Sequence, residues 1–119
     1  MKLILSFVIS FGLLSSMSAK ANEAVIEAMG EYLMFQEYES GIILPQQIDQ
    51  SVFEAVTWID TRDSEQFGKQ TIPGAIHIEW RQVIERMDEI PTDRKVIVFC
   101  NTGSLFAQAA FALRVAGFD

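Results

Sequence analysis

The chain has 119 residues, half of them hydrophobic, and its 16 Asp and Glu outnumber its 9 Lys and Arg to give a formal net charge of −7. The basic residues are scattered, so the sequence lacks the positive footprint of a nucleic-acid-binding protein and we expect no nucleic-acid partner. A single cysteine and a single histidine supply no zinc site of known ligand spacing, and we expect neither a metal nor an organic cofactor.

The first 21 residues are typical of a signal peptide. Lys2 supplies a positive charge, and the apolar stretch from Leu3 to Leu14 is too short to span a bilayer. Ala19-Lys20-Ala21 then gives the small-x-small pattern that signal peptidase recognises. We predict cleavage after Ala21, which would make the protein periplasmic or secreted and leave no membrane anchor. The alternative is a tethered amphipathic N-terminus.

Residues 22–40 are predicted to form an N-terminal helical extension. Apolar residues recur at helical spacing from Ala24 to Tyr38, glutamates occupy the other positions, and Ser40-Gly41 stop the helix. We expect this helix to pack on the domain that follows. The alternative is that its apolar face binds a partner.

Residues 41–119 alternate short apolar runs with helical patterns, which indicates one α/β domain with a mostly parallel sheet and helices on both faces. The expected strands are Gly41–Leu44, Val56–Asp60, Ala75–Ile78 and Val96–Phe99. The expected helices are Pro45 to about Gln50, Ser64–Gly68, Trp80–Met87 and Leu105–Ala116, the last closed by Gly117. Active sites in such sheets lie beyond the carboxyl ends of the strands.

Cys100 occupies such a place, between a buried strand and a helix. The loop that follows is Asn101-Thr102-Gly103-Ser104, whose successive N–H groups would form a nest for an anion, with Gly103 permitting the tight curl. These N–H groups and the positive end of the helix dipole favour a thiolate, which is the reactive form of cysteine. The alternatives are a small, inert buried cysteine or one paired between molecules.

Three segments, in chain order, resemble the rhodanese-like (sulfurtransferase) family in its exported, single-domain form. They are Trp58-Ile59-Asp60-Thr61-Arg62-Asp63, then Glu65-Gln66-Phe67-Gly68 with Ile72-Pro73-Gly74-Ala75-Ile76-His77-Ile78, and finally the strand–Cys100-x-x-Gly103 loop. The resemblance covers about Gly41 to Asp119. It implies that Cys100 attacks the outer sulfur of a donor, becomes a persulfide, and passes that sulfur to cyanide or to another thiol.

The resemblance also implies which residues surround the nucleophile. Asn101, Thr102, Gly103, Ser104 and Leu105 would form the loop that holds the persulfide or the substrate. Asp60 and Arg62 match the family's Asp-x-Arg segment and lie two apart on a strand, so they point to one face. Either they hold the active-site loop, which we favour, or Arg62 supplies a positive charge to the substrate.

Leu105 and Phe106 depart from the family pattern, which often has Arg and then Ser or Thr at these positions. Arg binds a sulfonate with two hydrogen bonds and Leu cannot, so an apolar persulfide or a protein thiol suits this loop better than thiosulfate. Related phosphatases and arsenate reductases need Arg where Phe106 stands, so we do not expect phosphatase activity.

His77 lies in the predicted strand Ala75–Ile78, where alternation points it outward, opposite Ile76 and Ile78. We therefore do not expect it to act as a general base.

Two further expectations follow from the resemblance. The family adds another strand, a Gly-Gly turn and a last helix after the position of Asp119, so we expect the sequence to be C-terminally incomplete. The expected function is that of a sulfurtransferase or persulfide carrier acting on a small sulfur-donor anion or a protein thiol. The alternative is a non-catalytic module that binds a periplasmic protein through Leu105, Phe106 and the N-terminal helix.

Overall fold

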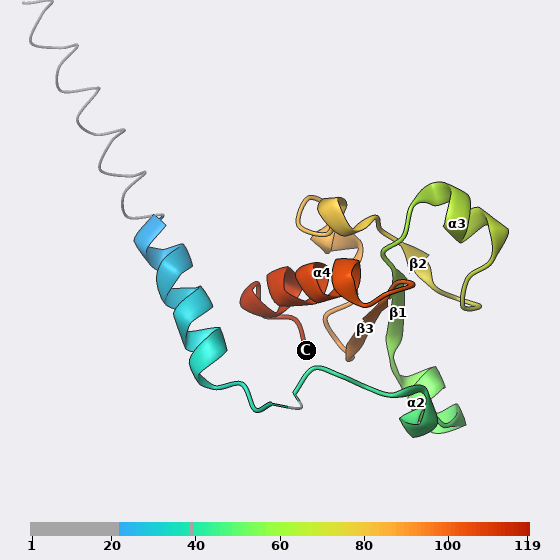
Figure 1. Cartoon of the computed structure of the whole chain (residues 1–119), viewed down its shortest axis with the longest axis horizontal. Coiled ribbons are helices and arrows are strands. Elements are labelled where there is room, and N and C mark those ends of the chain that lie inside the picture. The colour runs from blue at the N-terminus through green and yellow to red at the C-terminus, as the bar shows by residue number, and fades with distance from the viewer. Residues whose placement is uncertain (1–21, 39) are drawn as a thin grey trace, which may run out of the picture. The chain divides into compact units, whose positions relative to one another are not determined.

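The computed structural model describes residues 22–38 and 40–119, and the chain divides into two compact units, Met1–Glu37 and Tyr38–Asp119 (Figure 1). The predicted signal peptide lies outside the described residues. In the first unit residues 22–34 are helical, so the predicted helix exists but ends short of Tyr38. Within the described ranges, no helix has the length and apolar character needed to cross a membrane.

The second unit is built on a three-stranded parallel sheet with the strand order β2-β1-β3. The central strand is β1 (Thr57–Asp60), flanked by β2 (Ile76–His77) and β3 (Val96–Phe99). Asp60 is the register partner of both His77 and Phe99, so the carboxyl ends of the three strands meet at one edge. The predicted α/β class with a parallel sheet is confirmed.

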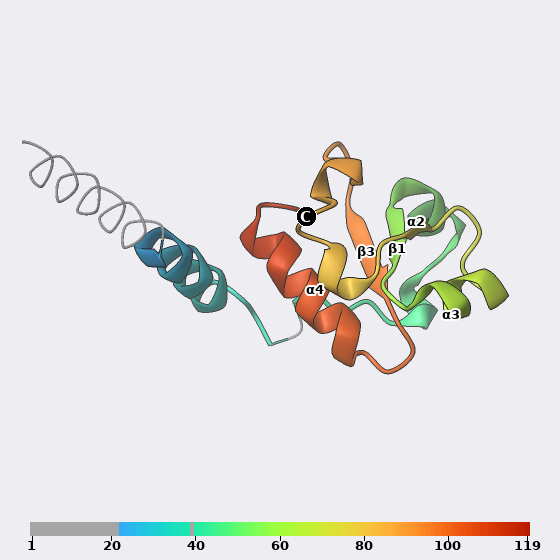
Figure 2. The same cartoon turned by 90° about the horizontal axis from the view of Figure 1, so that it is seen from above.

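Helices cover both faces of this sheet (Figure 2). On one side lie α4 (Ser104–Val115) and the 3-10 turn η2 (Trp80–Gln82); on the other lie α2 (Gln50–Ala55) and α3 (Ser64–Lys69). The main core lies under α4, because alternate strand residues point to that face and meet its apolar side. Its buried members are Ile59, Ile78, Val83, Ile90, Ala109 and Leu113.

A smaller aromatic cluster fills the opposite face. Trp58, next to Ile59 on β1, points away from the main core, and its ring centroid lies 5.3 Å from that of Phe53 on α2. Its indole N–H donates to the carbonyl of Phe53 at 3.0 Å, and Phe99 of β3 meets it edge-on at 6.4 Å. Adjacent residues of β1 therefore pack on opposite faces of the sheet, Ile59 in the main core and Trp58 in the aromatic cluster.

Two predicted elements are wrong. Residues 41–44 form no strand: Ile42 and Leu44 are exposed, and no neighbouring strand pairs with their backbone. The predicted helix Trp80–Met87 is instead two short 3-10 turns, η2 and η3 (Met87–Glu89), joined by turn residues. Val83, between the two turns, and Ile90, directly after η3, are both buried in the core.

The helix predicted from Pro45 is also shorter than expected, because Pro45–Gln47 is a single 3-10 turn, η1. The α-helix begins afterwards, at Gln50, where the Asp49 carboxylate accepts a hydrogen bond from the Val52 N–H at 2.9 Å. That side-chain cap satisfies one of the first N–H groups of α2 and fixes its start. At the other end of the domain, α4 lies within one residue of the predicted bounds and is followed by Gly117 at φ +97°.

Candidate active site

The carboxyl edge of the sheet brings together the segments in which the sequence predicted a site. Cys100 follows β3, Asp60 and Arg62 lie at and just beyond the end of β1, and His77 ends β2. Parallel strands in the observed register place these three segments side by side.

The loop after Cys100 curls back so that its backbone faces the sulfur. The Gly103 N–H donates to Cys100 Sγ at 3.2 Å, and Gly103 has a φ of +87°, a conformation that favours glycine. A Cβ at this position would also lie 3.3 Å from Cε1 of Phe106. Gly103 is therefore required both for the backbone angle and for the close approach of the Phe106 ring. Ser104 begins α4 directly after it.

The half-buried thiol of Cys100 is free and electrostatically activated. Burial raises its pKa, but the backbone N–H groups of Phe106, Thr102, Gly103 and Leu105 lower it by more, so the pKa lies below its ordinary value. A lowered pKa increases the thiolate fraction near neutral pH. This geometry favours a working thiol over an inert buried one.

Asp60 and Arg62 form a buried ion pair beneath the loop. The Arg62 Nε and Nη2 atoms donate to Asp60 Oδ1 at 2.9 Å and Oδ2 at 2.6 Å. The Arg62 N–H and the Thr71 hydroxyl also donate to this fully buried carboxylate, at 3.1 and 2.8 Å. Burial raises the pKa of Asp60, but these hydrogen bonds and the Arg62 charge lower it by more, so the carboxyl stays ionised.

The remaining donors of Arg62 are directed to the protein rather than to the space above Cys100. Nη2 also donates to the Gln70 carbonyl at 2.6 Å, and Nη1 lies 3.4 Å from Asn101 Oδ1. The guanidinium lies 5.9 Å from the centre of the Phe99 ring. These contacts support the interpretation that Arg62 holds the active-site loop, because few of its N–H groups are left for a substrate.

Two residues that the sequence analysis did not select also support the loop. Thr61 is fully buried, and both its hydroxyl and its N–H donate to the Phe99 carbonyl, at 2.8 and 3.0 Å, fixing the peptide before Cys100. Gln66 on α3 accepts a hydrogen bond from the Asn101 side-chain amide. Thr61 and Gln66 both lie inside segments that resemble the family, but nothing in the local sequence pairs Gln66 with Asn101.

His77 does not point freely outward as predicted. It is half-buried, its ring stacks on Phe67 with the centroids 4.6 Å apart, and its Nε2 atom lies 2.7 Å from the Arg62 carbonyl oxygen. A carbonyl only accepts hydrogen bonds, so Nε2 carries a proton in this contact. His77 thus braces the backbone of Arg62.

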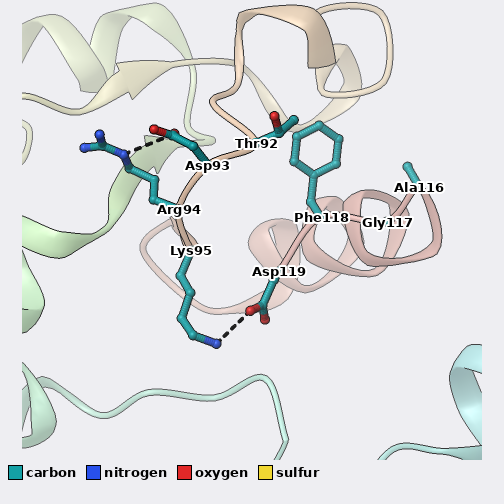
Figure 3. A pocket seen from close by; sticks show the side chains of 8 residues that line it. All are labelled: Thr92, Asp93, Arg94, Lys95, Ala116, Gly117, Phe118 and Asp119. Carbon is teal, nitrogen blue, oxygen red and sulfur yellow. Dashed lines mark hydrogen bonds and ion pairs between the residues drawn. The ribbon is translucent and has the colours of Figure 1, made fainter.

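The hollow drawn in Figure 3, of about 440 Å³, lies at the opposite edge of the sheet. Its charged side chains pair with one another: Arg94 with Asp93 at 3.4 Å, and Lys95 with Asp119 at 2.8 Å. It borders the amino end of β3, whereas Cys100 follows the carboxyl end, so this hollow is not part of the candidate active site. In the part of the chain that the structure describes, no three His, Cys, Asp or Glu side chains cluster in a way that could hold a metal ion.

The parallel sheet with a strand–cysteine–loop–helix junction defines the class of protein. The family model for the rhodanese-like domain matches residues 44–119, and the chain belongs to the rhodanese-like domain family.

The chain is also similar in sequence to several curated proteins. The chain is 38% identical over 69 residues to "Thiosulfate sulfurtransferase PspE" of Escherichia coli (strain K12), covering 56% of this chain and 66% of that protein. It is 32% identical over 65 residues to "Sulfurtransferase" of Allochromatium vinosum, covering 55% and 61%. It is 29% identical over 65 residues to "Putative sulfur carrier protein YrkF" of Bacillus subtilis (strain 168), covering 55% and 35%. The chain thus spans less than two thirds of the length of these relatives.

Solved structures share the fold. A rhodanese-related protein from Thermoplasma volcanium superposes with a TM-score of 0.54 at 25% identity, covering 57% of this chain and 68% of that one. Reduced CoADR-RHD of Bacillus anthracis superposes with a TM-score of 0.57 at 27% identity, covering 62% and 13%.

Proposed function

We propose that this protein is a sulfurtransferase or persulfide carrier in which Cys100 holds the transferred sulfur. The observation that carries the proposal is the convergence of backbone N–H groups on Cys100 Sγ, which lowers the pKa of the thiol. Its membership in the rhodanese-like family and the names of two relatives, both sulfurtransferases, support the same chemistry.

The proposed reaction has two displacement steps. The Cys100 thiolate attacks the outer sulfur of a donor, forming an S–S bond as the donor's own bond to that sulfur breaks. The leaving group departs with the electron pair as a thiolate, or as sulfite if the donor is thiosulfate. The acceptor thiolate or cyanide then attacks the outer sulfur of the Cys100 persulfide, and Cys100 leaves as a thiolate stabilised by the loop N–H groups.

We further propose that an organic persulfide or a protein thiol persulfide is a better donor than thiosulfate. Leu105 and Phe106 are half-buried apolar residues at the loop, and the Arg62 guanidinium is engaged by Asp60, Gln70 and Asn101. A sulfonate would therefore be held by backbone N–H groups without a bidentate arginine.

The test is intact mass after incubation of the protein with an organic persulfide or with thiosulfate. We expect a one-sulfur adduct that an added thiol or cyanide removes and that is absent in Cys100→Ser. Failure to form the adduct, or an adduct that survives Cys100→Ser, would overturn the proposal.

The alternative, a non-catalytic module binding a periplasmic protein, is favoured by the exposed apolar side chains of the first unit, among them Val25, Ile26 and Leu33. A partner retained by Cys100→Ser but lost in Leu105→Asp, together with absence of turnover, would favour it. Robust turnover without such a partner would remove it.

We also propose that the protein is exported and cleaved after Ala21, on the pattern of charge and small residues in the sequence. N-terminal sequencing of the protein from a periplasmic fraction should begin at Asn22. Recovery of an uncleaved chain would contradict this proposal.

A further inference from the structure

The side chain of Asn101 is held from two sides by groups on different elements. Arg62 Nη1, beyond the end of β1, lies 3.4 Å from Asn101 Oδ1, and Asn101 Nδ2 donates to Gln66 Oε1 on α3. Gln66 Nε2 donates in turn to Asp63 Oδ2 at 2.7 Å. These four residues, Arg62, Asn101, Gln66 and Asp63, form a continuous chain of hydrogen bonds that we name the amide relay.

The chemistry of its two ends gives the amide relay a single direction. A guanidinium only donates hydrogen bonds and an ionised carboxylate only accepts them, so each amide between them has one orientation that satisfies both neighbours. The Asp63 end is ionised, because hydrogen bonds from the Gln66 backbone and side chain lower the pKa of that carboxyl. Hydrogen bonds aligned in this way from a cation to an anion polarise one another.

The amide relay is anchored in the domain at Arg62 and next to Gln66. Arg62 is fixed by the buried carboxylate of Asp60, and its carbonyl contacts His77 at 2.7 Å. On α3, the residue after Gln66 is Phe67, whose ring stacks on His77. The Asn101 side chain therefore connects the first residue of the loop to a part of the protein held by the sheet.

We infer that Gln66 and the side chain of Asn101 are positioning residues that keep the active-site loop closed around Cys100. The inference rests on the proposed function, since positioning matters only if Cys100 reacts. The loop contains Gly103 at φ +87°, and Thr102 beside it is exposed, so the packing of its own side chains does little to fix its shape. A tether at Asn101, directly after Cys100, limits the movement of the N–H groups that face the sulfur.

The experiment measures the rate of Cys100 alkylation by iodoacetamide as a function of pH in the full chain. The variants are Gln66→Ala, Asn101→Ala and their double variant. The matched control is Gln50→Ala: Gln50 lies on α2, another six-residue helix, and its side chain also donates to a carboxylate, that of Glu54, at 2.5 Å. Gln50 begins the helix that leads into the amino end of β1, whereas the loop follows the carboxyl end of β3.

We expect each relay variant to shift the pH profile of alkylation upward and to slow alkylation at pH 7 by about fivefold, the effect of one hydrogen bond. The double variant should match the single variants, because removing either residue breaks the same relay. Gln50→Ala should match the unaltered protein. Loss of thermal stability without a shifted pH profile would show a merely structural role and overturn the inference.

Single-variant effects that add in the double variant, or a Gln66→Ala profile identical to that of Gln50→Ala, would also overturn it. Alkylation does not require a sulfur donor, so the outcome is separable from that of the proposed function. A chain that forms no persulfide but shows coupled effects at Gln66 and Asn101 would refute sulfur transfer and retain the positioning role.

Discussion

At the scale of single residues, none of the loop residues 101–105 that follow Cys100 carries a charge. The Arg62 guanidinium contacts the loop at Asn101, but its side chain is only 15% exposed and is bound to Asp60. Cys100 is therefore activated mainly by backbone N–H groups. Such groups stabilise the small anionic sulfur of a thiolate or a persulfide, but they bind a large anion less strongly than a guanidinium does.

Leu105→Arg should consequently change donor preference. The new guanidinium would add a bidentate donor for a sulfonate, and we expect kcat/KM for thiosulfate to rise about tenfold while that for an organic persulfide changes little. Steady-state turnover with cyanide as acceptor measures both values. Leu105→Met is the uncharged control, and equal values for thiosulfate in the Arg and Met variants would contradict the prediction.

The sequence predicted several residues of the site but not the long-range contacts between them. Asp60, Arg62 and Cys100 were selected because their residue types and spacing carry chemistry. The contacts of Asn101 with Arg62 and Gln66 join residues that are 39 and 35 positions apart in the sequence, so no local sequence pattern predicts them. The predicted outward exposure of His77 was wrong. Strand alternation predicts which face of the sheet a residue lies on, but not what covers that face, which here is Phe67 of α3.

At the scale of elements, the junction between the loop and α4 is the most constrained part of the site. Gly103 provides both the positive φ that turns the chain and the N–H that contacts the sulfur. Gly103→Ala should destabilise the fold by about 1–2 kcal/mol through backbone strain, and further through the Phe106 contact. It should also slow Cys100 alkylation several-fold.

Urea unfolding and alkylation kinetics test this prediction, with Gly68→Ala as the control. Gly68 is on α3, has no atom within 4 Å of an added Cβ, and adopts an ordinary backbone angle. Equal behaviour of the two variants would show that the positive φ at Gly103 is not needed.

The elements predicted most accurately are those whose apolar residues pack against the rest of the domain. β3 was predicted with its observed bounds, and β1 to within one residue, because their apolar runs fill the core or the aromatic cluster. Residues 41–44 have the same apolar character but no strand beside them, and a strand exists only when its backbone is paired. After Trp80 the core residues Val83 and Ile90 lie seven positions apart, a spacing that a helix also has, so periodicity alone did not reveal that the chain forms short 3-10 turns there.

At the scale of the whole molecule, the second unit contains its own core. Every buried hydrophobic residue in the described ranges lies between Trp58 and Leu113, and no side chain of residues 22–38 is buried. Removing residues 1–37 should therefore change the urea midpoint of the remaining chain little and leave Cys100 alkylation unchanged. A large drop in the midpoint, measured by circular dichroism, would show that the first unit stabilises the second.

Acid should unfold the molecule chiefly through Asp60. Its pKa is depressed in the folded state, so its contribution to the free energy of unfolding is complete above the unfolded value of about 3.8 and is lost as pH falls through the folded value. Exposed carboxyls with lowered pKa values, such as Asp63 and Glu89, contribute less because solvent screens them.

Asp60→Asn should cost about 3–5 kcal/mol at pH 7, since it leaves Arg62 without its buried partner. The same variant should lose less stability than the unaltered protein as pH falls from about 5 through 3.8 and on through the lower folded pKa of Asp60. Urea unfolding across that range, with Glu65→Gln as the exposed control, measures both effects. Parallel acid dependence in the Asp60→Asn and unaltered proteins would show that the buried pair does not govern acid stability.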